Sequence, residues 1–261
     1  MSKEPFKKSP NYQSKKNIVA GRNPVAEALR SGQLIDKILL FKNASGESIN
    51  DIRLLAKTYN VPIQFVPVEK LNSLTNIQHQ GVVAFKSGVA YQDLQQVIDW
   101  VTERGEAPLF LMLDGVTDVR NIGAMARSAV CCGAQAIIIP EKGVGALNEE
   151  AVKSSAGALE KIQVCRTQSL MKATEILHLN GIKLFTSEMK AARKLHQLNL
   201  QEPCCIVMGN EEKGVQKGLA DEADEHFTIP MKGEFDSFNV SVAAGIILYE
   251  AMKQRMYGNI E

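Results

Sequence analysis

Three glycine-containing segments hold polar side chains of the kinds that bind ligands or take part in catalysis. The first, residues 114–127, places Asn121 and Gly123 where a loop is expected to turn into a helix, and Arg127 follows within that helix. The helix is rich in alanine and is predicted to be buried, and a buried guanidinium needs an anionic partner. Because the planar guanidinium donates two parallel hydrogen bonds, a phosphate or a carboxylate suits it. The segment therefore favours an anionic ligand, although Asn121 alone could simply cap the helix.

The second segment, residues 207–214, follows an apolar run and contains Gly209, Glu211 and Gly214. Glycines let a backbone approach a ligand closely, because no Cβ atom intervenes. The glutamate between them adds a charged group that can bind or orient a partner. An ordinary turn from a strand into a helix uses the same residues, so this segment alone does not identify a site.

The third segment, residues 228–245, places Ser237, Asn239 and Ser241 at alternate positions. A long apolar stretch follows, which predicts a helix that begins at this point. One small polar residue suffices to cap a helix. Three of them within five positions exceed that need and favour contact with a ligand.

Short apolar runs precede these segments and predict the strands that position them. Runs such as 109–113 and 205–208 are hydrophobic throughout, which is typical of strands buried in a parallel sheet. Ligands of open α/β sheets bind beyond the carboxyl ends of the strands, so the three segments should meet there. The pattern predicts further strands at 136–139, 163–165 and 183–186, and helices at 123–132, 148–158, 171–180 and 241–256.

A smaller α/β domain is predicted ahead of this one. Asn23 is expected to cap a helix that has Pro24 at its first position and ends near Gly32. Strands at 35–41, 63–66 and 82–87 and helices at 49–59 and 68–74 complete the alternation. We therefore expect a first domain over 17–89, a charged helical linker over 90–106, and a second, doubly wound α/β domain over 107–261.

The charge is unevenly distributed along a chain of ordinary globular composition. Hydrophobic residues make up 45% of the 261 residues, and no apolar run approaches the ~20 residues that span a bilayer. Residues 1–16 carry a net charge of +4 and are expected to be disordered, whereas 17–106 are neutral and 107–261 carry −3. A basic tail adds affinity for phosphate, although it also serves as a solubilising end.

The cysteines indicate the compartment. Their number is five, with no C-x-x-C spacing, which fits neither a disulfide framework nor a zinc site. Most lie in apolar stretches and are expected to be small buried side chains. We therefore expect a reducing, cytoplasmic location, no metal and no membrane segment.

The order of the three motifs is similar to that of a known enzyme family. Asn-x-Gly-Ala-x-x-Arg, then Gly-x-Glu-x-x-Gly, then Ile-Pro-Met-x-Gly-x-x-x-Ser-Phe-Asn-Val-Ser-Val-Ala resembles the SpoU/TrmH family of RNA ribose 2′-O-methyltransferases. Gly-Arg-Asn-Pro-Val-x-Glu-Ala-Leu, from Gly21, and His-Gln-Gly-Val-Val-Ala, from His79, resemble the substrate-binding domain that precedes the catalytic domain in this family. The resemblance covers roughly residues 17–256, and it looks closest to the branch that methylates a guanosine in large-subunit (23S) ribosomal RNA.

The resemblance implies a fold, a cofactor and an assembly. The parallel-sheet catalytic domain would contain a deep trefoil knot, which general topology rules alone would not predict. S-adenosylmethionine would bind bent in the knot, largely to backbone groups at the positions of Gly209, Ile229 and Phe238, with Thr186 contributing from a strand end. Phe238 departs from the leucine usual in the family, so the packing of adenine is expected to differ slightly. The enzyme would act on RNA as a homodimer, with each site lined by both chains.

The polar residues that match the family's active site are Asn121, Arg127, Glu211, Ser237 and Asn239. A ribose 2′-hydroxyl, which is a weak acid, must attack the methyl group of a cationic sulfonium, so the site aligns both and removes a proton. Arginine is effectively always protonated in proteins. We therefore expect Arg127 to hold an RNA phosphate rather than to act as the base. Ser237 and Asn239 would orient the hydroxyl and the sugar, and Glu211 would hold Asn121 or Arg127 in place.

Three other interpretations remain. A nicotinamide-dependent enzyme is disfavoured, because Gly143 and Gly145 follow a strand but Asn148 stands where the third glycine of that motif belongs. An RNA-binding assembly factor without activity would not need the complete set of polar residues. The third is the same chemistry on a different RNA, such as a transfer RNA or a resistance-type ribosomal site; the full first domain favours ribosomal RNA.

Overall fold

The computed structural model describes residues 17–188, 191–233 and 237–258. The chain divides into two compact units, one ending at Ser87 and one beginning at Gly88. The basic tail over 1–16 lies outside the described residues. In the described part of the chain, no helix is long and apolar enough to cross a membrane.

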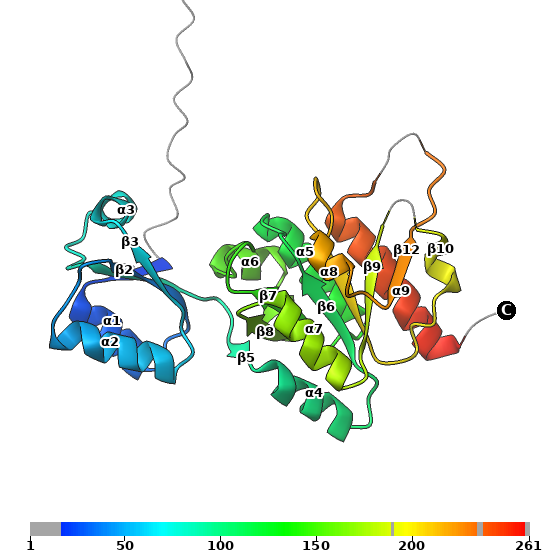
Figure 1. Cartoon of the computed structure of the whole chain (residues 1–261), viewed down its shortest axis with the longest axis horizontal. Coiled ribbons are helices and arrows are strands. Elements are labelled where there is room, and N and C mark those ends of the chain that lie inside the picture. The colour runs from blue at the N-terminus through cyan, green and yellow to red at the C-terminus, as the bar shows by residue number, and fades with distance from the viewer. Residues whose placement is uncertain (1–16, 189–190, 234–236, 259–261) are drawn as a thin grey trace, which may run out of the picture. The chain divides into compact units, whose positions relative to one another are not determined.

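The first unit is a four-stranded mixed sheet covered by helices on both faces (Figure 1). Its strands are β1 (Ile18–Ala20), β2 (Ile35–Phe41), β3 (Ile63–Val66) and β4 (Val82–Lys86), in the order β1-β4-β2-β3. Its helices are α1 (Arg22–Arg30), α2 (Glu47–Thr58) and α3 (Val68–Leu74). Along β2, Ile38 and Leu40 pack with α1 and α2, whereas Leu39 packs with α3. The alternation of the strand therefore supplies both cores.

The start of α1 differs from the expectation. The residue before the helix is Gly21, and Asn23 lies inside the first turn with an exposed side chain. Gly21 has a φ of 104°, a backbone conformation that glycine adopts without strain. It lets the chain turn from β1 directly into the helix. Pro24 is tolerated there, because the first turn needs no donor from its backbone nitrogen.

The second unit contains an eight-stranded sheet in which every pair is parallel. The strands are β5 (Tyr91–Gln92), β6 (Leu109–Leu113), β7 (Ala136–Pro140), β8 (Gln163–Thr167), β9 (Lys183–Ser187), β10 (Arg193–Lys194), β11 (Cys204–Met208) and β12 (Glu225–Thr228). The helices are α4 (Leu94–Glu103), α5 (Val119–Cys131), α6 (Glu149–Ser154), α7 (Leu170–Leu179), α8 (Lys217–Ala220) and α9 (Val240–Tyr257). The expected α/β architecture with a parallel sheet is confirmed.

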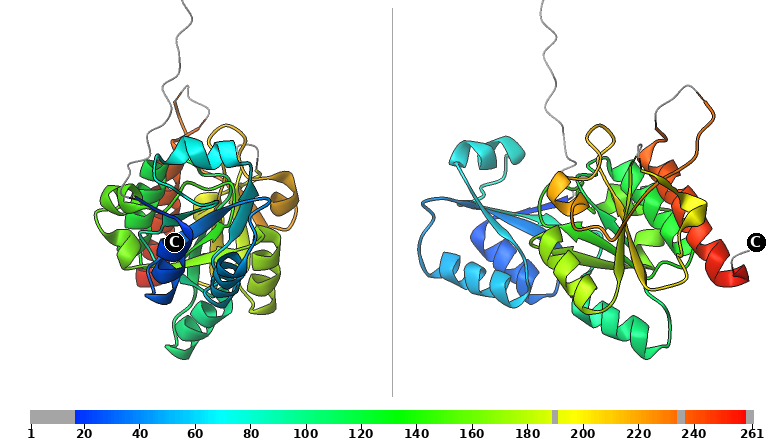
Figure 2. Two further views of the ribbon diagram at one scale, coloured as in Figure 1. Left: turned by 90° about the vertical axis from the view of Figure 1, so that its left-hand side faces the viewer. Right: turned by 45° about the vertical axis from the view of Figure 1, so that its right-hand side comes forward.

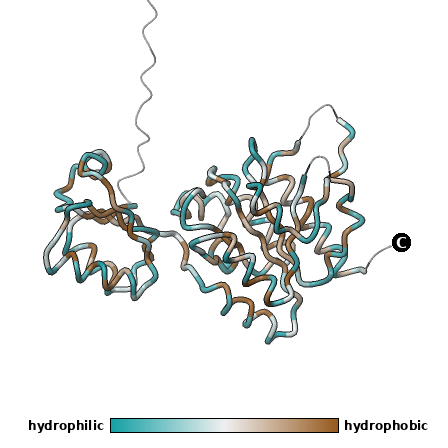
Figure 3. The backbone as a smooth tube through the Cα atoms, viewed as in Figure 1, coloured by the Kyte–Doolittle hydropathy of each residue, from teal (hydrophilic) through white to brown (hydrophobic). Residues whose placement is uncertain are grey.

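Two apolar cores lie on opposite faces of this sheet. Leu109, Leu111 and Leu113 of β6 pack with α5, α6 and α9, whereas Phe110 and Met112 pack with α4, α7 and α8. The helices form one layer on each side of the strands (Figure 2), and hydrophobic residues are concentrated in the strands (Figure 3). Burial on both faces explains why these strands are apolar throughout.

The strand order β10-β12-β9-β11-β6-β7-β8-β5 determines where the site forms. From β6 the chain first adds β7 and β8 on one side, and then adds β9, β11 and β12 on the other side. The carboxyl ends of β9, β11 and β12 are neighbours, which is consistent with the expected knot.

The expected linker over 90–106 belongs instead to the second unit. β5 pairs with β8, and Leu94, Val97, Ile98 and Val101 of α4 are buried against the sheet. These residues have the spacing of an amphipathic helix, and the residues between them, which are mainly polar, lie on its more exposed face.

Other elements differ in their bounds. α5 begins at Val119, four residues earlier than expected, because Asp118 caps it by accepting a hydrogen bond from the backbone of Arg120. β10 and β12 were not expected, because they are short and partly polar. β12 nevertheless forms a wall of the site described next.

Candidate active site

A closed set of hydrogen bonds joins Asn121, Glu211 and Asn239. The side-chain amides of Asn121 and Asn239 both donate to Glu211 Oε1, over 2.9 and 2.7 Å. Asn239 Nδ2 also lies 3.3 Å from Asn121 Oδ1. Asn121 and Glu211 are 90 positions apart in the sequence, and Glu211 and Asn239 are 28 apart, yet the three side chains meet at the surface. The structure confirms that the three polar segments meet at the carboxyl side of the sheet.

Each member of this cluster is positioned by the element that carries it. Asn121 lies in the first turn of α5, after its cap. Asn239 is the cap of α9, because its Oδ1 accepts from the backbone nitrogen of Ser241 over 3.0 Å and from the Ser241 hydroxyl. Its carbonyl is thereby fixed, which directs its NH₂ group toward Glu211. The cap and the cluster therefore use opposite ends of one amide.

The loop that carries Glu211 is fixed at both ends. Asn210 donates to the backbone oxygen of Gly115 over 3.0 Å and accepts from the backbone nitrogens of Glu212 and Lys213. Asp114, which is 2% exposed, accepts from Gln216 through both carboxylate oxygens, at 2.6 and 2.8 Å. These anchors were not expected from the sequence. For Asp114, the available signal was a charged residue directly after an apolar strand, since a buried charge needs hydrogen-bond partners.

The loop folds so tightly that its first residue must be glycine. A Cβ atom on Gly209 would lie 2.2 Å from the carbonyl carbon of Gly214 and 2.3 Å from the nitrogen of Val215. Asn210 and Gly214 also pair through both backbone groups, at 3.0 and 2.8 Å. Backbone groups therefore form the wall at this end of β11.

A cavity of about 550 Å³ lies beside the cluster, over the ends of β9, β11 and β12. Three of the four expected cofactor positions line it: Gly209, Ile229 and Phe238. Glu211 and Ser237 line it as well. Its volume falls within the range of about 300–1,000 Å³ usual for small-molecule sites. The wall combines backbone, apolar side chains and a few polar groups, which suits a nucleoside with a polar tail.

Thr186, the fourth expected cofactor residue, lies away from the cavity. Thr186 is fully buried and does not line the cavity, and its hydroxyl lies 2.8 Å from His226 Nδ1. Ser187 and Glu188 form the wall at that strand end instead. Sequence reasoning missed Glu188, although a carboxylate directly after a buried strand was the available signal.

Arg127 is exposed rather than buried. Six helical residues turn by about 600°, so Asn121 and Arg127 leave α5 roughly 120° apart and about 9 Å apart along its axis. Within the described ranges, no carboxylate pairs with the guanidinium. The structure thus does not bring Arg127 into the cluster of its own chain, and its charge is available to another molecule.

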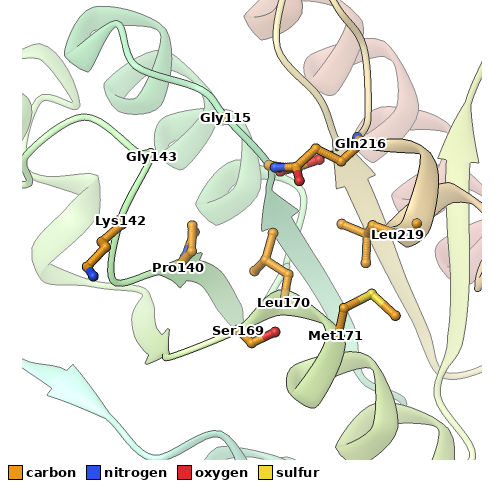
Figure 4. Close-up of a pocket in the computed structure, with 11 residues that line it drawn as sticks. Gly115, Pro140, Lys142, Gly143, Ser169, Leu170, Met171, Gln216 and Leu219 are labelled. Atoms are coloured by element: carbon orange, nitrogen blue, oxygen red, sulfur yellow. Dashed lines mark hydrogen bonds between the residues drawn. The ribbon is translucent and has the colours of Figure 1, made fainter.

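A second cavity, of about 240 Å³, tests the nicotinamide interpretation (Figure 4). Leu170, Met171 and Leu219 form an apolar side of it, and Lys142 and Gly143 form part of the opposite wall. A dinucleotide needs a helix amino terminus for its phosphates.

The helix that follows Gly143 and Gly145 is α6, and it is poorly suited to bind a phosphate. It has six residues, and its first turn carries Glu149 and Glu150. Gly145 serves packing, since a Cβ atom there would lie 2.5 Å from the backbone oxygen of Thr117. These features argue against a nucleotide phosphate at the start of α6, where the glycine motif would place it. Among the residues of the described ranges, no three His, Cys, Asp or Glu side chains gather as a metal site.

Comparison with known proteins decides the family. The model of the SpoU rRNA methylase family matches residues 108–249, and that of the RNA 2′-O ribose methyltransferase substrate-binding domain matches residues 18–92. The chain belongs to the SpoU rRNA methylase family. Its cofactor is S-adenosylmethionine, and its chemistry is that of an RNA 2′-O-methyltransferase.

Relatives span nearly the whole SpoU chain. It is 34% identical to a putative TrmH family tRNA/rRNA methyltransferase of Staphylococcus epidermidis over 238 residues, which cover 91% of this chain and 96% of that protein. A protein of the same description from Bacillus subtilis is 33% identical over 92% of this chain and 96% of its own length. The structure of the SpoU methyltransferase AviRb from Streptomyces viridochromogenes with AdoMet has a TM-score of 0.58 and 26% identity. That alignment covers 92% of this chain and 91% of the AviRb chain.

Proposed function

We propose that this SpoU methyltransferase methylates the ribose 2′-hydroxyl of a guanosine in 23S ribosomal RNA. The observation that carries the chemistry is the cluster of Asn121, Glu211 and Asn239 at the rim of the cavity. The choice of ribosomal RNA rests on the complete first unit. The substrate-binding model matches it over residues 18–92.

The distribution of charge supports contact between the first unit and RNA. With the boundary at Ser87, residues 17–87 hold eight basic and five acidic side chains, and residues 88–261 hold 17 basic and 23 acidic ones. The first unit therefore carries +3 and the catalytic unit −6. Phosphate contacts supply most of the non-specific affinity for RNA, so the first unit is the better anchor.

The first unit also contains an open cavity of about 630 Å³. Asn23, Asn43 and Gln80 line it together with Arg22. The Arg22 guanidinium donates to the backbone oxygens of Ser45 and Gln80, over 3.2 and 3.1 Å, and is held in place. Amides and a fixed guanidinium match the edges of unpaired bases, which is how proteins read single-stranded RNA.

S-adenosylmethionine occupies the cavity of about 550 Å³ in this proposal. Its sulfonium group supplies an electrophilic methyl group. Backbone groups at Gly209, Ile229 and Phe238 hold the cofactor. Methionine and phenylalanine side chains beside them exclude water from the adenine ring.

The cluster then positions the RNA. Ser237 and Asn239 bind the target ribose, and Glu211 keeps both amides in their orientation. Glu211 Oε1 accepts both amide bonds, and the described residues bring no donor to Oε2. The exposed Arg127 guanidinium binds an RNA phosphate bidentately. Holding the hydroxyl in line with the methyl group supplies most of the acceleration.

A homodimer completes the site in this proposal. Val242, Tyr249 and Met256 are 49, 59 and 62% exposed and repeat at seven-residue intervals along α9. A helix that is apolar on all sides needs a second partner beyond its own core. α9 packs on α5, where Gly245 faces the Ser128 side chain beside Arg127. A second copy on this face would place its charged groups near the first copy's cavity.

Transfer of a labelled methyl group tests the function. Unmodified ribosomal and transfer RNA are incubated with the enzyme or with Arg127→Ala. Alkali-resistant label in 23S RNA, lost in the variant, is the expected result. Label in transfer RNA would retain the chemistry and change the substrate. No label in any RNA or ribosomal particle, despite measurable cofactor binding, would leave an inactive assembly factor.

Complementation between variants tests the shared site. Arg127→Ala and Glu211→Gln are each expected to be inactive as homodimers. If sites are lined by both chains, each mixed dimer has about half of the wild-type activity, because one of its two sites holds both intact residues. A random mixture of the two variants, in which about half of the dimers are mixed, then regains about a quarter. Mixtures as inactive as the parents would place all catalytic groups on one chain.

A reducing cytoplasm remains the predicted compartment.

A further inference from the structure

Glu188 stands at the carboxyl end of β9, on the wall of the cofactor cavity. Its backbone nitrogen donates to the oxygen of Phe227 over 2.7 Å. Its carboxylate Oε1 lies 3.0 Å from His226 Nδ1, which also lies 2.8 Å from the Thr186 hydroxyl. The contact with Glu188 is at ion-pair distance, and the contact with Thr186 has hydrogen-bond geometry. The Glu188 side chain is half-exposed and lies beside β12.

The strand order gives Glu188 a particular place along the cofactor. β9 lies between β11 and β12, so Glu188 projects from the middle strand beneath the cavity. The β11 side ends in Glu211 and the catalytic cluster, where the reacting sulfonium must lie. The β12 side ends in Ile229, near the apolar part of the wall, which suits the adenine ring. The ribose joins those two parts of the cofactor and so lies over β9.

We propose that the Glu188 carboxylate binds the 2′- and 3′-hydroxyl groups of the cofactor's ribose, and that His226 positions it. This rests on the proposed seat of S-adenosylmethionine. Two vicinal hydroxyls match the two oxygens of a carboxylate, and acidic residues at strand ends bind ribose in this way in other α/β folds. Oε1 lies 3.0 Å from His226 Nδ1, and each carboxylate oxygen can accept more than one hydrogen bond. Backbone contacts hold the adenine, whereas this side chain recognises the sugar.

A ligand pair with and without the diol tests the contact. Dissociation constants are measured by titration calorimetry on the full chain for S-adenosylhomocysteine and for its 2′,3′-dideoxyribose analogue. The enzyme is compared with Glu188→Ala and with Glu222→Ala, an exposed carboxylate outside the cavity. Loss of a charge-assisted hydrogen bond corresponds to a roughly tenfold to hundredfold weaker complex.

Glu188→Ala is expected to raise the dissociation constant for S-adenosylhomocysteine by that factor. The wild type is expected to bind the dideoxy analogue more weakly than S-adenosylhomocysteine by the same factor. Glu188→Ala should then bind both ligands within about twofold, because the two changes remove one interaction. Unchanged affinity for S-adenosylhomocysteine would overturn the proposal. An equal loss for both ligands would also overturn it, because the carboxylate would then face the ammonium or the adenine.

His226→Phe tests the positioning role. It should weaken the binding of S-adenosylhomocysteine less than Glu188→Ala does and leave the affinity for the dideoxy analogue unchanged. In the double variant it should weaken binding no further than Glu188→Ala alone. Additive losses would show that His226 acts independently of Glu188. Absence of measurable binding of S-adenosylhomocysteine to the wild type would overturn the cofactor seat itself, which distinguishes that failure from a failure of this contact.

Discussion

Asn239 uses one amide for two purposes: its NH₂ group donates to Glu211 over 2.7 Å, while its oxygen caps α9 through the backbone of Ser241 over 3.0 Å. The first contact belongs to the proposed active site, and the second belongs to the stability of the longest helix. A single substitution can separate them, because aspartate caps helices as well as asparagine does.

Asn239→Asp is expected to keep the stability and to lose the activity. The cap remains, so the melting temperature should stay within a few degrees, or about 1 kcal/mol. The donor to Glu211 is replaced by a like charge, which displaces both side chains and should lower kcat about 100-fold. Asn239→Ala should lower both quantities. Wild-type turnover in Asn239→Asp would remove this contact from the mechanism.

Arg127→Ala is expected to abolish methyl transfer without affecting cofactor binding. The side chain is exposed, so the free energy of unfolding should change by less than about 0.5 kcal/mol. Calorimetry with S-adenosylhomocysteine and methyl transfer to RNA measure the two effects. Arg127→Lys distinguishes the roles, since a basic limb of the pH–rate profile that moves with lysine would make this residue the base.

Gly209→Ala is expected to destroy the cofactor cavity. The added Cβ atom would lie 2.2 Å from the carbonyl carbon of Gly214 and 2.3 Å from the nitrogen of Val215. Both are main-chain atoms, which cannot move aside without a large cost in energy. Binding of S-adenosylhomocysteine should be lost, and the free energy of unfolding should fall by about 1–3 kcal/mol. Gly218→Ala is the matched control, because no atom lies within 4 Å of a Cβ atom at that position. Equal effects of the two changes would contradict the tight loop.

Arg255→Met is expected to destabilise the second unit without touching the site. The guanidinium donates to the backbone oxygens of Ala107, Pro108, Leu200 and Glu202, over 2.6 to 2.9 Å. Leaving these acceptors without a donor should cost about 2–4 kcal/mol in urea unfolding. Lys253→Met removes the same charge from a partly exposed ion pair and should cost less than about 1 kcal/mol. A similar loss in both variants would assign the effect to charge alone.

Alkaline pH is expected to destabilise the chain through its buried thiols. Burial raises the pKa of Cys165 to about 12, whereas the unfolded thiol ionises near its ordinary pKa of about 8.5. The folded state then holds the proton that the unfolded state releases. This stabilising contribution is complete below about pH 8.5 and is lost as the pH rises toward 12, by up to about 1.4 kcal/mol per pH unit.

Cys165→Ala should reduce the fall in unfolding free energy between pH 8 and pH 10, measured in urea with reductant. Cys131→Ala, which removes an exposed thiol, should leave that fall unchanged. An identical pH dependence in the wild type and Cys165→Ala would show that this thiol does not contribute.

The sequence predicted the strands and the meeting of the three polar segments well, because both follow from local pattern. Apolar runs such as 109–113 could be buried only within a parallel sheet, and their following loops had to converge. Linker and helix bounds were less predictable. The apolar stripe of α4 is diluted by charges, and Asp118 rather than Asn121 caps α5.

Relations between distant segments could not be read from the sequence. Whether Arg127 is buried depends on which faces of α5 are covered by α6 and α9. The ion-pair contact between Glu188 and His226 depends on β12 pairing with β9, which neither residue type indicates. The catalytic and cofactor-binding roles of all the site residues remain predictions.

The strand order also has a consequence for biosynthesis. Every wall of the cofactor cavity comes from residues after Thr186, and Arg255 ties the end of α9 to the start of β6. During translation, β6, β7 and β8 emerge before β11, which pairs with the other edge of β6, so that edge is uncovered in the nascent sheet. The enzyme thus gains its cofactor site only when its last helix has left the ribosome.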